Sequence, residues 1–439
     1  MDYIADLHVH SPFSRATSIS SDPAGLSAWA RIKGIHVIGS GDFTHPGWLS
    51  RLKEELEPAE PGFYRLVDKD VPSPFPGISL PDSPVRFMLS AEISCIYKKH
   101  GSVRKVHNLI YLPDFESAER VASRLRRIGN IESDGRPILG LDSRNLLEIV
   151  LEEAPEGFLV PAHIWTPWFS LFGSKSGFDT VEECFGDLHS EVFALETGLS
   201  SDPAMNRMVS ALDRFALISN SDCHSPSRLG REANIFSTGF DFFSLRDSLK
   251  ENSRKTFRGT IEFFPEEGKY HLDGHRGCEV CLEPKETRRL NGRCPVCGRP
   301  VTVGVLHRVK ELADREHAVF RPESPDVFSM VPLPEIIGEI RAVGPASKEV
   351  AHFYCSLISR FGSEFGLLVF ASIDEIRKES SLLAEAIRRL REGQVIRYPG
   401  YDGLFGAIKL FREDEIHGLA EGDSLFASKV RSKRRGNPL

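Results

Sequence analysis

Short apolar runs and longer amphipathic stretches alternate along the first 260 residues of the chain. Seven apolar runs have the length and the β-branched or aromatic content of strands. They span residues 3–9, 35–39, 85–93, 106–112, 157–162, 192–196 and 215–220. Amphipathic segments that predict helices separate several of them, at residues 22–33, 117–128 and 143–153. This alternation favours a parallel sheet with crossover helices, either a distorted seven-stranded βα barrel or an open doubly wound sheet.

The pattern changes near residue 262. Four cysteines and many glycines follow within residues 265–300, and helix formers dominate residues 347–391. We therefore predict a catalytic domain at 1–262 and a zinc-ribbon module at 263–310. A mostly helical C-terminal domain at 311–428 and a disordered basic tail at 429–439 complete the predicted organisation.

The composition is that of a soluble globular protein, with 439 residues, 27% charged and 41% hydrophobic. The chain contains no run of about 18 apolar residues, so we expect no membrane span. Its N-terminus is acidic and polar rather than basic and then apolar, which does not resemble a secretory signal. We expect a cytoplasmic protein whose cysteines are reduced or bound to metal.

Histidines and carboxylates gather at the ends of the predicted strands. Asp6, His8 and His10 alternate with apolar residues, so the period of a strand puts the three polar side chains on one face. Asp222 and His224 repeat this spacing at the seventh strand. The other members of the set are Asp42, His45, Glu92, His107, His163 and Glu196. In a βα barrel, the carboxyl ends of the strands converge on one face, where the active site lies.

Such a convergence of imidazoles and carboxylates is stable only if the groups are paired or bound to metal. These donors suit Zn, Mn or Fe(II), and their number is enough for two or three bridged divalent ions, Mg included. A metal cluster of this kind supports phosphoester hydrolysis, because the ions activate water and stabilise the phosphoryl oxygens.

The same residues resemble the motifs of the PHP (polymerase and histidinol phosphatase) superfamily. The motifs are residues 6–11, residues 41–45, Glu92, His107, His163 and residues 222–224. The resemblance covers about residues 1–260 and implies a distorted seven-stranded βα barrel with a trinuclear metal centre. Many members carry a contiguous Asp-His pair in the second motif. Here two residues separate Asp42 from His45, so either of them is a candidate ligand.

Further segments resemble the endonuclease Q family. They are residues 161–170, 173–179 and 196–202, together with the downstream four-cysteine module. The family is metal-dependent and joins a PHP domain to a zinc-binding module and a C-terminal domain. It nicks DNA on the 5′ side of deaminated bases (hypoxanthine, uracil, xanthine) and of abasic sites. The resemblance therefore implies single- or double-stranded DNA with such lesions as the binding partner.

The cysteine module has the spacing Cys278-x2-Cys281-x12-Cys294-x2-Cys297. Two such pairs can supply four thiolates to one tetrahedral structural zinc ion. Pro295 and Gly298 favour a tight turn at the second pair, whereas no glycine follows the first pair. We interpret Cys95, Cys184, Cys223 and Cys355 as core residues, since they lack such spacing.

Candidate DNA contacts lie in the aromatic segment at residues 164–190 and in the zinc module. The net charge of −7 does not exclude DNA, because bound metals add positive charge where the carboxylates gather. Aromatic side chains can stack on a base or wedge a duplex open, although the segment could equally be a lid over the barrel. The candidates are Trp165, Trp168, Phe169, Ser174, Lys175, Ser176, Arg288 and Arg289.

The sequence thus predicts a DNA repair endonuclease with a multinuclear metal centre. Glu92, His163 and Asp222 are its central catalytic candidates, and His8, His10, His107 and His224 complete the ligand set with Asp42 or His45. We expect Asp6 and Glu196 to orient the ligand imidazoles. The alternatives are a phosphatase for a small phosphoester such as histidinol phosphate, or a non-catalytic nucleic-acid-binding scaffold.

Overall fold

The computed structural model of the chain describes residues 2–68, 70–76, 78–412, 415, 416 and 425. The described residues form two compact units. The first runs up to Met330 and includes Tyr398–Ala407, and the second comprises Val331–Arg397 and the described residues from Ile408 onward. The predicted basic tail at 429–439 lies outside the described residues.

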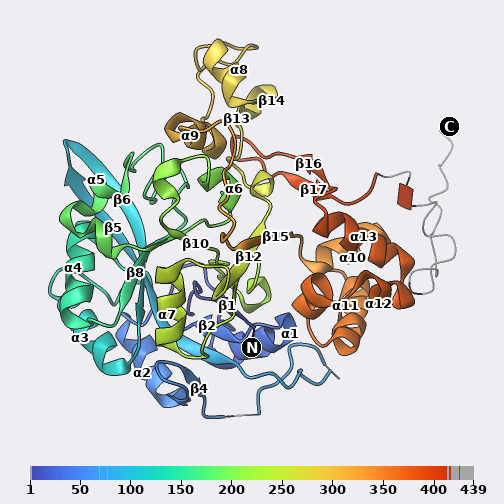
Figure 1. Cartoon of the computed structure of the whole chain (residues 1–439), viewed down its shortest axis with the longest axis horizontal. Helices are drawn as coiled ribbons and strands as arrows, with labels where there is room; N and C mark the ends of the chain where they lie inside the picture. Colours follow the sequence, from blue (N-terminus) through green and yellow to red (C-terminus); the bar gives the residue numbers. More distant parts are fainter. Residues whose placement is uncertain (1, 69, 77, 413–414, 417–424, 426–439) are drawn as a thin grey trace, which may run out of the picture. The chain divides into compact units, whose positions relative to one another are not determined.

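The first unit is a mixed α/β structure built on a central sheet (Figure 1). The strands of this sheet are β1 (Tyr3–Asp6), β2 (Val37–Gly39), β3 (Leu56–Pro58), β4 (Tyr64–Leu66), β5 (Arg86–Lys99), β6 (Ser102–Leu112), β7 (Ile138–Leu139), β8 (Phe158–Pro161), β11 (Ala233–Phe236), β12 (Phe257–Phe263) and β15 (Asp326–Met330). A separate parallel pair consists of β9 (Ala194–Glu196) and β10 (Ala216–Ile218). Every one of the seven predicted apolar runs contains a strand.

The prediction of a parallel sheet is wrong, because the central sheet is mixed. β1, β2 and β5 pair in parallel, whereas β5 pairs antiparallel with β6, and β6 antiparallel with β8. The cause is local: His100 and Gly101, with φ of 52° and 76°, form the connection between β5 and β6. Two left-handed residues in a two-residue loop match the twist of an antiparallel hairpin.

The described helices of the first unit are α1 (Pro23–Lys33), α2 (Pro46–Glu55), α3 (Phe115–Arg126), α4 (Ser143–Glu153), α5 (Val181–Phe185), α6 (Pro203–Asn206), α7 (Phe242–Glu251), α8 (Pro284–Arg289) and α9 (Val305–Leu312). Three of them, α1, α3 and α4, lie where the amphipathic pattern predicted helices. Asp22 caps α1 by accepting a hydrogen bond from the Gly25 amide, and Gly34 ends it at φ 85°. α3 packs on β6, and α4 packs on β6 and β8. α7 contributes Phe242, a buried member of the core cluster.

The carboxyl ends of β1, β8, β9 and β10 meet at one place. The Leu7 amide donates to the Asn220 side chain at 2.8 Å, and Val9 and Cys223 form an isolated parallel bridge. The Ile164 amide donates to the Glu196 carbonyl at 3.0 Å. Residues that follow these strands are therefore held side by side, as the candidate site requires.

The second unit is mostly helical, as predicted. It contains α10 (Leu333–Arg341), α11 (Lys348–Phe361), a π-helical turn (Gly366–Phe370), α12 (Ile373–Glu379) and α13 (Ser381–Arg391). The remaining strands form two small two-stranded sheets, β13 (Asp273–His275) antiparallel with β14 (Val280–Leu282), and β16 (Ile396–Tyr398) with β17 (Ala407–Lys409). β15 pairs with β12, so residues 326–330 group with the first unit. Among the described residues, no helix combines the length and apolarity that a membrane crossing requires.

Two buried carboxyl groups, Glu232 and Glu262, belong neither to the predicted metal centre nor to the predicted zinc module. Glu262 of β12 accepts hydrogen bonds from Ser219 and, at 3.5 Å, from Thr197. Burial raises the pKa of Glu262 to about 8. Burial and the charge of Glu262 also raise the pKa of Glu232, whose Oε1 accepts from the Phe263 amide at 3.3 Å.

We expect this pair to make the folded state less stable as the pH rises. A carboxyl whose pKa is raised on folding stabilises the fold fully below its unfolded pKa, and this contribution disappears as the pH passes the folded pKa. Denaturant unfolding between about pH 5 and pH 9 should therefore show a decline of at least about 1 kcal/mol. Glu262→Gln should flatten this decline, whereas exposed Glu152→Gln should leave it unchanged; equal profiles for parent and Glu262→Gln would contradict the assignment.

Candidate metal centre

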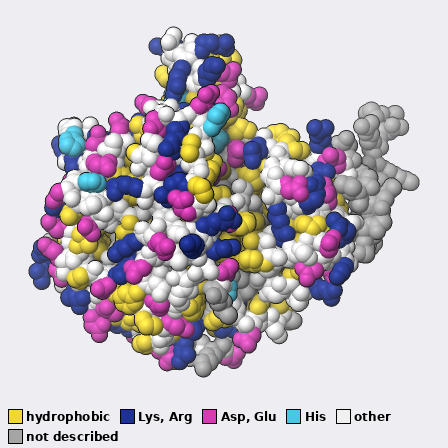
Figure 2. All heavy atoms as spheres, viewed as in Figure 1, with side chains coloured by type: hydrophobic (Ala, Val, Ile, Leu, Met, Phe, Trp, Pro, Cys, Tyr) yellow, Lys and Arg dark blue, Asp and Glu magenta, His cyan; other side chains and the backbone are white. Residues whose placement is uncertain are grey.

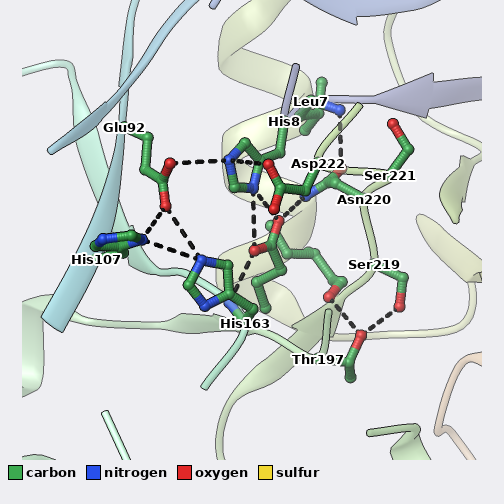
Figure 3. A network of polar contacts seen from close by, with 12 residues as sticks. Leu7, His8, Glu92, His107, His163, Thr197, Ser219, Asn220, Ser221 and Asp222 are labelled. Carbon is green, nitrogen blue, oxygen red and sulfur yellow. Dashed lines mark hydrogen bonds and ion pairs between the residues drawn. The ribbon is translucent and has the colours of Figure 1, made fainter. Parts of the chain in front are cut away.

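Six predicted residues from five segments come together in one buried space. Figure 3 shows five of them, His8, Glu92, His107, His163 and Asp222. The first group lies around one oxygen of Glu92, on β5. Its Oε2 is 3.6 Å from His8 Nε2 and 3.3 Å from His10 Nε2. Asp222 Oδ1 is 3.5 Å and 3.0 Å from the same two nitrogens. Four side chains from three distant segments of the sequence thus surround a single point.

The second group lies around the other oxygen of Glu92. Its Oε1 is 2.6 Å from His107 Nδ1 and 3.1 Å from His163 Nε2. The two imidazole nitrogens are 3.3 Å apart. The Glu92 side chain is buried, so its carboxylate is shared between the two groups without contact to bulk water.

The donor chemistry of both groups fits divalent metal ions. Three buried ligand atoms of the first group, His8 Nε2, His10 Nε2 and Asp222 Oδ1, have no hydrogen-bond partner. A buried polar atom without a partner is costly, so three of them aimed at one point indicate a missing ligand. Imidazole nitrogen and carboxylate oxygen are suited to Zn, Mn or Fe(II).

A second layer of carboxylates orients the imidazoles. Glu196 accepts from His8 Nδ1 at 3.1 Å, as predicted, and its Oε2 also accepts from the His163 amide at 2.8 Å. Asp42 lies 3.1 Å from His10 Nδ1. A proton held on Nδ1 by a carboxylate leaves Nε2 free to bind a metal, which is the arrangement typical of metal-binding histidines.

Three predicted site residues have other roles in the structure. Asp42 is not in either group, because Ser11 and Ser14 donate to its second oxygen while His10 occupies the first. His45 is also outside them, and its Nε2 lies 3.0 Å from the Glu132 carbonyl. Asp6 orients no imidazole. It accepts from the amides of Ser221 at 3.0 Å and Gly230 at 2.8 Å, and so fixes the loop that carries Asp222.

The backbone around the site is strained. Asp42, His163 and Asp222 have φ of 49°, 31° and 48°, a region that residues other than glycine rarely adopt. Gly198 allows the close approach at His163, since a Cβ on Gly198 would lie 2.4 Å from the His163 Cβ. Such conformations persist only where the surroundings enforce them, and they cluster at functional sites.

In the metal-free site, protons on the imidazoles balance the negative charges of the carboxylates. Burial alone would lower the pKa of His8 and His10, but facing carboxylates hold both pKa values well above the ordinary value. Burial alone would raise the pKa of Glu92, but His107 and Arg136 hold it well below. Protons and a guanidinium thus neutralise the carboxylates, and an incoming cation must displace the protons.

Arg136 is a site residue that the sequence did not reveal. Its guanidinium is 3.1 Å from Glu92 Oε2 and about a third exposed, at 30%. It comes from a loop without a recognisable motif, so only the fold brings it to Glu92. His224 is close by but outside both groups. Its ring centroid is 4.5 Å from that of His10, and its Nδ1 lies 2.9 Å from the Asp222 carbonyl.

The aromatic segment divides into buried and exposed side chains. Trp165, a predicted DNA contact, is buried and donates to Asn206 at 2.8 Å, so its ring is packed inside the fold. Ser176 is also buried and bonds within the segment. Trp168 is 44% exposed, and Phe169 lies against His107 with ring centroids 4.8 Å apart. The remaining candidates, Ser174, Lys175, Arg288 and Arg289, are all exposed.

The cysteine module assembles a third group of potential ligands. Cys278, Cys294 and Cys297 come together with His275, whereas Cys281 is exposed and does not join them. Cys223 and Cys95 are buried as predicted.

Comparison with known proteins covers both units. The family model of the MJ0043 C-terminal domain matches residues 332–394. The protein MJ0043 of Methanocaldococcus jannaschii is 34% identical over 267 residues, which are 58% of this chain and 32% of the relative. The chain thus spans about a third of that relative's length. YqxK of Bacillus subtilis is 28% identical over 420 residues, 92% of this chain and 98% of the relative.

Two solved structures are similar over nearly the whole chain. The lesion-specific endonuclease PfuEndoQ from Pyrococcus furiosus has a TM-score of 0.81 and 29% identity, over 95% of this chain and 99% of that one. The predicted resemblance to the endonuclease Q family is confirmed. Endonuclease Q in complex with a 27-mer duplex carrying an abasic lesion has a TM-score of 0.79 and 28% identity, over 99% of this chain and 100% of that one. The prediction of an enzyme, a metal-dependent phosphodiesterase, is confirmed with it.

Metal binding to the metal-free protein is expected to release protons and to strengthen as the pH rises. The reason is that His8 and His10, whose pKa values are raised, must lose their protons before they can bind a cation. Calorimetric titration with Mn²⁺ or Zn²⁺ in two buffers of different ionisation enthalpy measures the protons released.

Glu92→Gln should weaken binding by at least about 100-fold, because both groups lose their shared carboxylate. Exposed Glu54→Gln is the matched control and should bind like the parent. Unchanged affinity in Glu92→Gln, without proton release in the parent, would contradict the metal centre.

Proposed function

We propose that the chain is a metal-dependent DNA repair endonuclease that cleaves the phosphodiester on the 5′ side of a damaged nucleotide. The observation that carries this proposal is the convergence of His8, His10, Glu92, His107, His163 and Asp222, with unpartnered nitrogens aimed at one point. The abasic duplex bound by the similar endonuclease Q supports DNA as the substrate. By the family resemblance, hypoxanthine, uracil and xanthine are further proposed lesions.

The donor set fits two or three divalent ions, and the residues that would hold them are His8, His10, Glu92, His107, His163 and Asp222. Such ions would supply Lewis acidity to the phosphoryl group and would lower the pKa of water. The chain's own residues then have distinct tasks. Glu196 and Asp42 keep the protons of His8 and His10 on Nδ1. Arg136 neutralises Glu92, and its partly exposed guanidinium would also donate to a phosphate oxygen.

An open pocket beside Asp222 supports a nucleotide-sized substrate. Its volume is about 630 Å³, and its lining includes Thr17, Ser221, His224, Arg228 and Arg231. This is within the range of sites that bind small ligands. We infer that the damaged nucleotide enters here, since an enzyme acting at a single base gains access by turning it out of the stack.

The outer DNA contacts are proposed on exposure and charge. Trp168 is the exposed aromatic candidate for stacking or wedging, and Lys175 lies in the same segment. Figure 2 shows Lys and Arg side chains on the projecting part that carries α8, where Arg288 and Arg289 lie. We further propose that residues 1–262 form the distorted seven-stranded barrel of the PHP type, followed by a zinc ribbon at 263–310 and the C-terminal domain from 311.

Incubation of full-length protein and Mn²⁺ with end-labelled duplexes tests the proposal. One duplex carries an abasic site, one a single hypoxanthine, and one no lesion. We expect a single nick on the 5′ side of each lesion and none in the intact duplex. Hydrolysis of histidinol phosphate without any nicking would instead favour the small-molecule phosphatase.

Asp222→Asn should reduce nicking by roughly 10³-fold or more, because the substitution removes a charged ligand of the first group. Lesion binding in gel-shift assays should remain within about threefold of the parent, since the pocket keeps its shape. Asp247→Asn, on an exposed face of α7, is the control. Full nicking activity in Asp222→Asn would remove this residue from the mechanism.

A further inference from the structure

A buried amide side chain lies next to the metal centre and belongs to neither ligand group. Asn220 follows β10 and has no exposed surface. Its Nδ2 donates to Glu196 Oε1 at 2.8 Å. Its Oδ1 accepts from the Leu7 amide at 2.8 Å (Figure 3) and from Asn234 Nδ2 at 2.9 Å. Asn220 therefore connects the end of β1 to the carboxylate that orients the His8 ring.

Backbone groups fix which end of the Asn220 amide faces Glu196. A backbone N–H can only donate, so the atom that faces the Leu7 amide is the Asn220 oxygen. For the same reason, the Asn234 atom that faces the Ser219 amide at 3.0 Å is its oxygen. Asn234 therefore presents its NH₂ group to Asn220. Both constraints leave the NH₂ group of Asn220 facing Glu196.

This NH₂ group holds one oxygen of the Glu196 carboxylate in place. The other oxygen accepts from the His163 amide at 2.8 Å. His8 Nδ1 lies between them, 3.1 Å from Oε1 and 3.2 Å from Oε2. His8 belongs to the first ligand group and His163 to the second. A displacement of the Glu196 carboxylate would therefore disturb both groups.

Asn220 also fixes the backbone that carries His8. Leu7 directly precedes His8, so the bond that the Leu7 amide donates holds the chain where the ligand begins. One side chain thus positions both the backbone of His8 and, through Glu196, the plane of its ring. Because these groups are buried, no water can take over either bond without rearrangement of the fold.

We propose that Asn220 is a positioning residue of the metal centre, which holds Glu196 so that His8 Nε2 is aimed at the metal. The inference rests on the proposed metal-dependent function, and it deepens that proposal by assigning a residue outside both ligand groups. The essential property is the polarity of the amide. An aspartate at 220 would have nearly the same shape, but it would face Glu196 with an oxygen. Two carboxylate oxygens at that distance repel each other or share a proton, and both outcomes weaken the hold on His8.

Near-isosteric variants of the metal-free full-length protein test this polarity, with Mn²⁺ binding measured by calorimetry. Asn220→Asp should weaken binding by about 10- to 100-fold, the usual effect of changing a group that orients a metal-bound imidazole. Glu196→Gln should weaken it similarly, because two NH₂ groups then face each other. Asn206→Asp is the matched control. Asn206 is also fully buried, but it bonds to Trp165 and Ser201, so this variant should bind Mn²⁺ like the parent.

The double variant Glu196→Gln/Asn220→Asp restores a donor opposite an acceptor with the polarity reversed. The new amide at 196 can donate to the carboxylate at 220, and its oxygen can still accept from the His163 amide and from His8 Nδ1. We expect this variant to bind Mn²⁺ at least about fivefold more tightly than Glu196→Gln alone, since contacting residues are energetically coupled. Glu196→Gln/Asn206→Asp carries the same net charge and should show no such gain.

Parent-like binding by Asn220→Asp would overturn the proposal, and so would a double variant that binds no more tightly than Glu196→Gln. This second comparison decides the question even if circular dichroism shows that Asn220→Asp alone does not fold. A parent that binds no Mn²⁺ would overturn the metal centre and this proposal together. A parent that binds Mn²⁺ but does not nick lesion-containing DNA would overturn only the proposed function, since none of the binding measurements uses DNA.

Discussion

The Glu92 carboxylate is the constraint on which the site depends. It is buried, and its two oxygens face different pairs of imidazoles, His8 with His10 and His107 with His163. A carboxylate in such a place is unstable unless cations neutralise it. Protonated imidazoles and Arg136 do so in the metal-free site, and divalent ions would do so more completely. Glu92 lies in the middle of the long strand β5, where its position is fixed by pairing with Leu109 of β6.

The surrounding structure serves to hold the other ligands against that bridge. Asp6 accepts two amide hydrogen bonds from the loop that carries Asp222, and Glu196 holds both the His8 ring and the His163 backbone. The left-handed backbone at His163 and Asp222 shows that the chain adopts unfavourable conformations to bring these side chains inward. Acidic residues outside the ligand groups thus act by position, and the carboxylates of the site lie where a metal centre would balance their charge.

Sequence reasoning identified the parts of the fold that depend on local pattern. The apolar runs predicted the strands, and capping residues such as Asp22 and Gly34 predicted the ends of α1.

Prediction from the sequence failed where the direction of strand pairing depends on a single turn. The His100–Gly101 loop turns β5 and β6 into an antiparallel hairpin. Neither these two residues nor the residues that flank them are a strong hairpin signal. Strand ends indicated His8, His10, Glu92, His107 and His163, which the fold brings together, but also His45 and His224, which lie outside both groups. Asp42 looked like a ligand because its type and position matched, but His10, Ser11 and Ser14 already occupy its two oxygens. Arg136 and His275 were missed, since a loop residue and a side chain across a hairpin become neighbours of their sites only in three dimensions.

Anomalous diffraction from crystals of the protein soaked with Mn²⁺ would show whether Glu92 is shared between metal ions, because it locates each ion relative to the carboxylate. We expect at least two anomalous peaks, one beside each oxygen of the Glu92 carboxylate, with His8, His10 and Asp222 around one and His107 and His163 around the other. Arg136 should still lie near the centre without being a ligand. A site that remains empty at saturating metal, or a single ion that does not contact Glu92, would contradict this expectation.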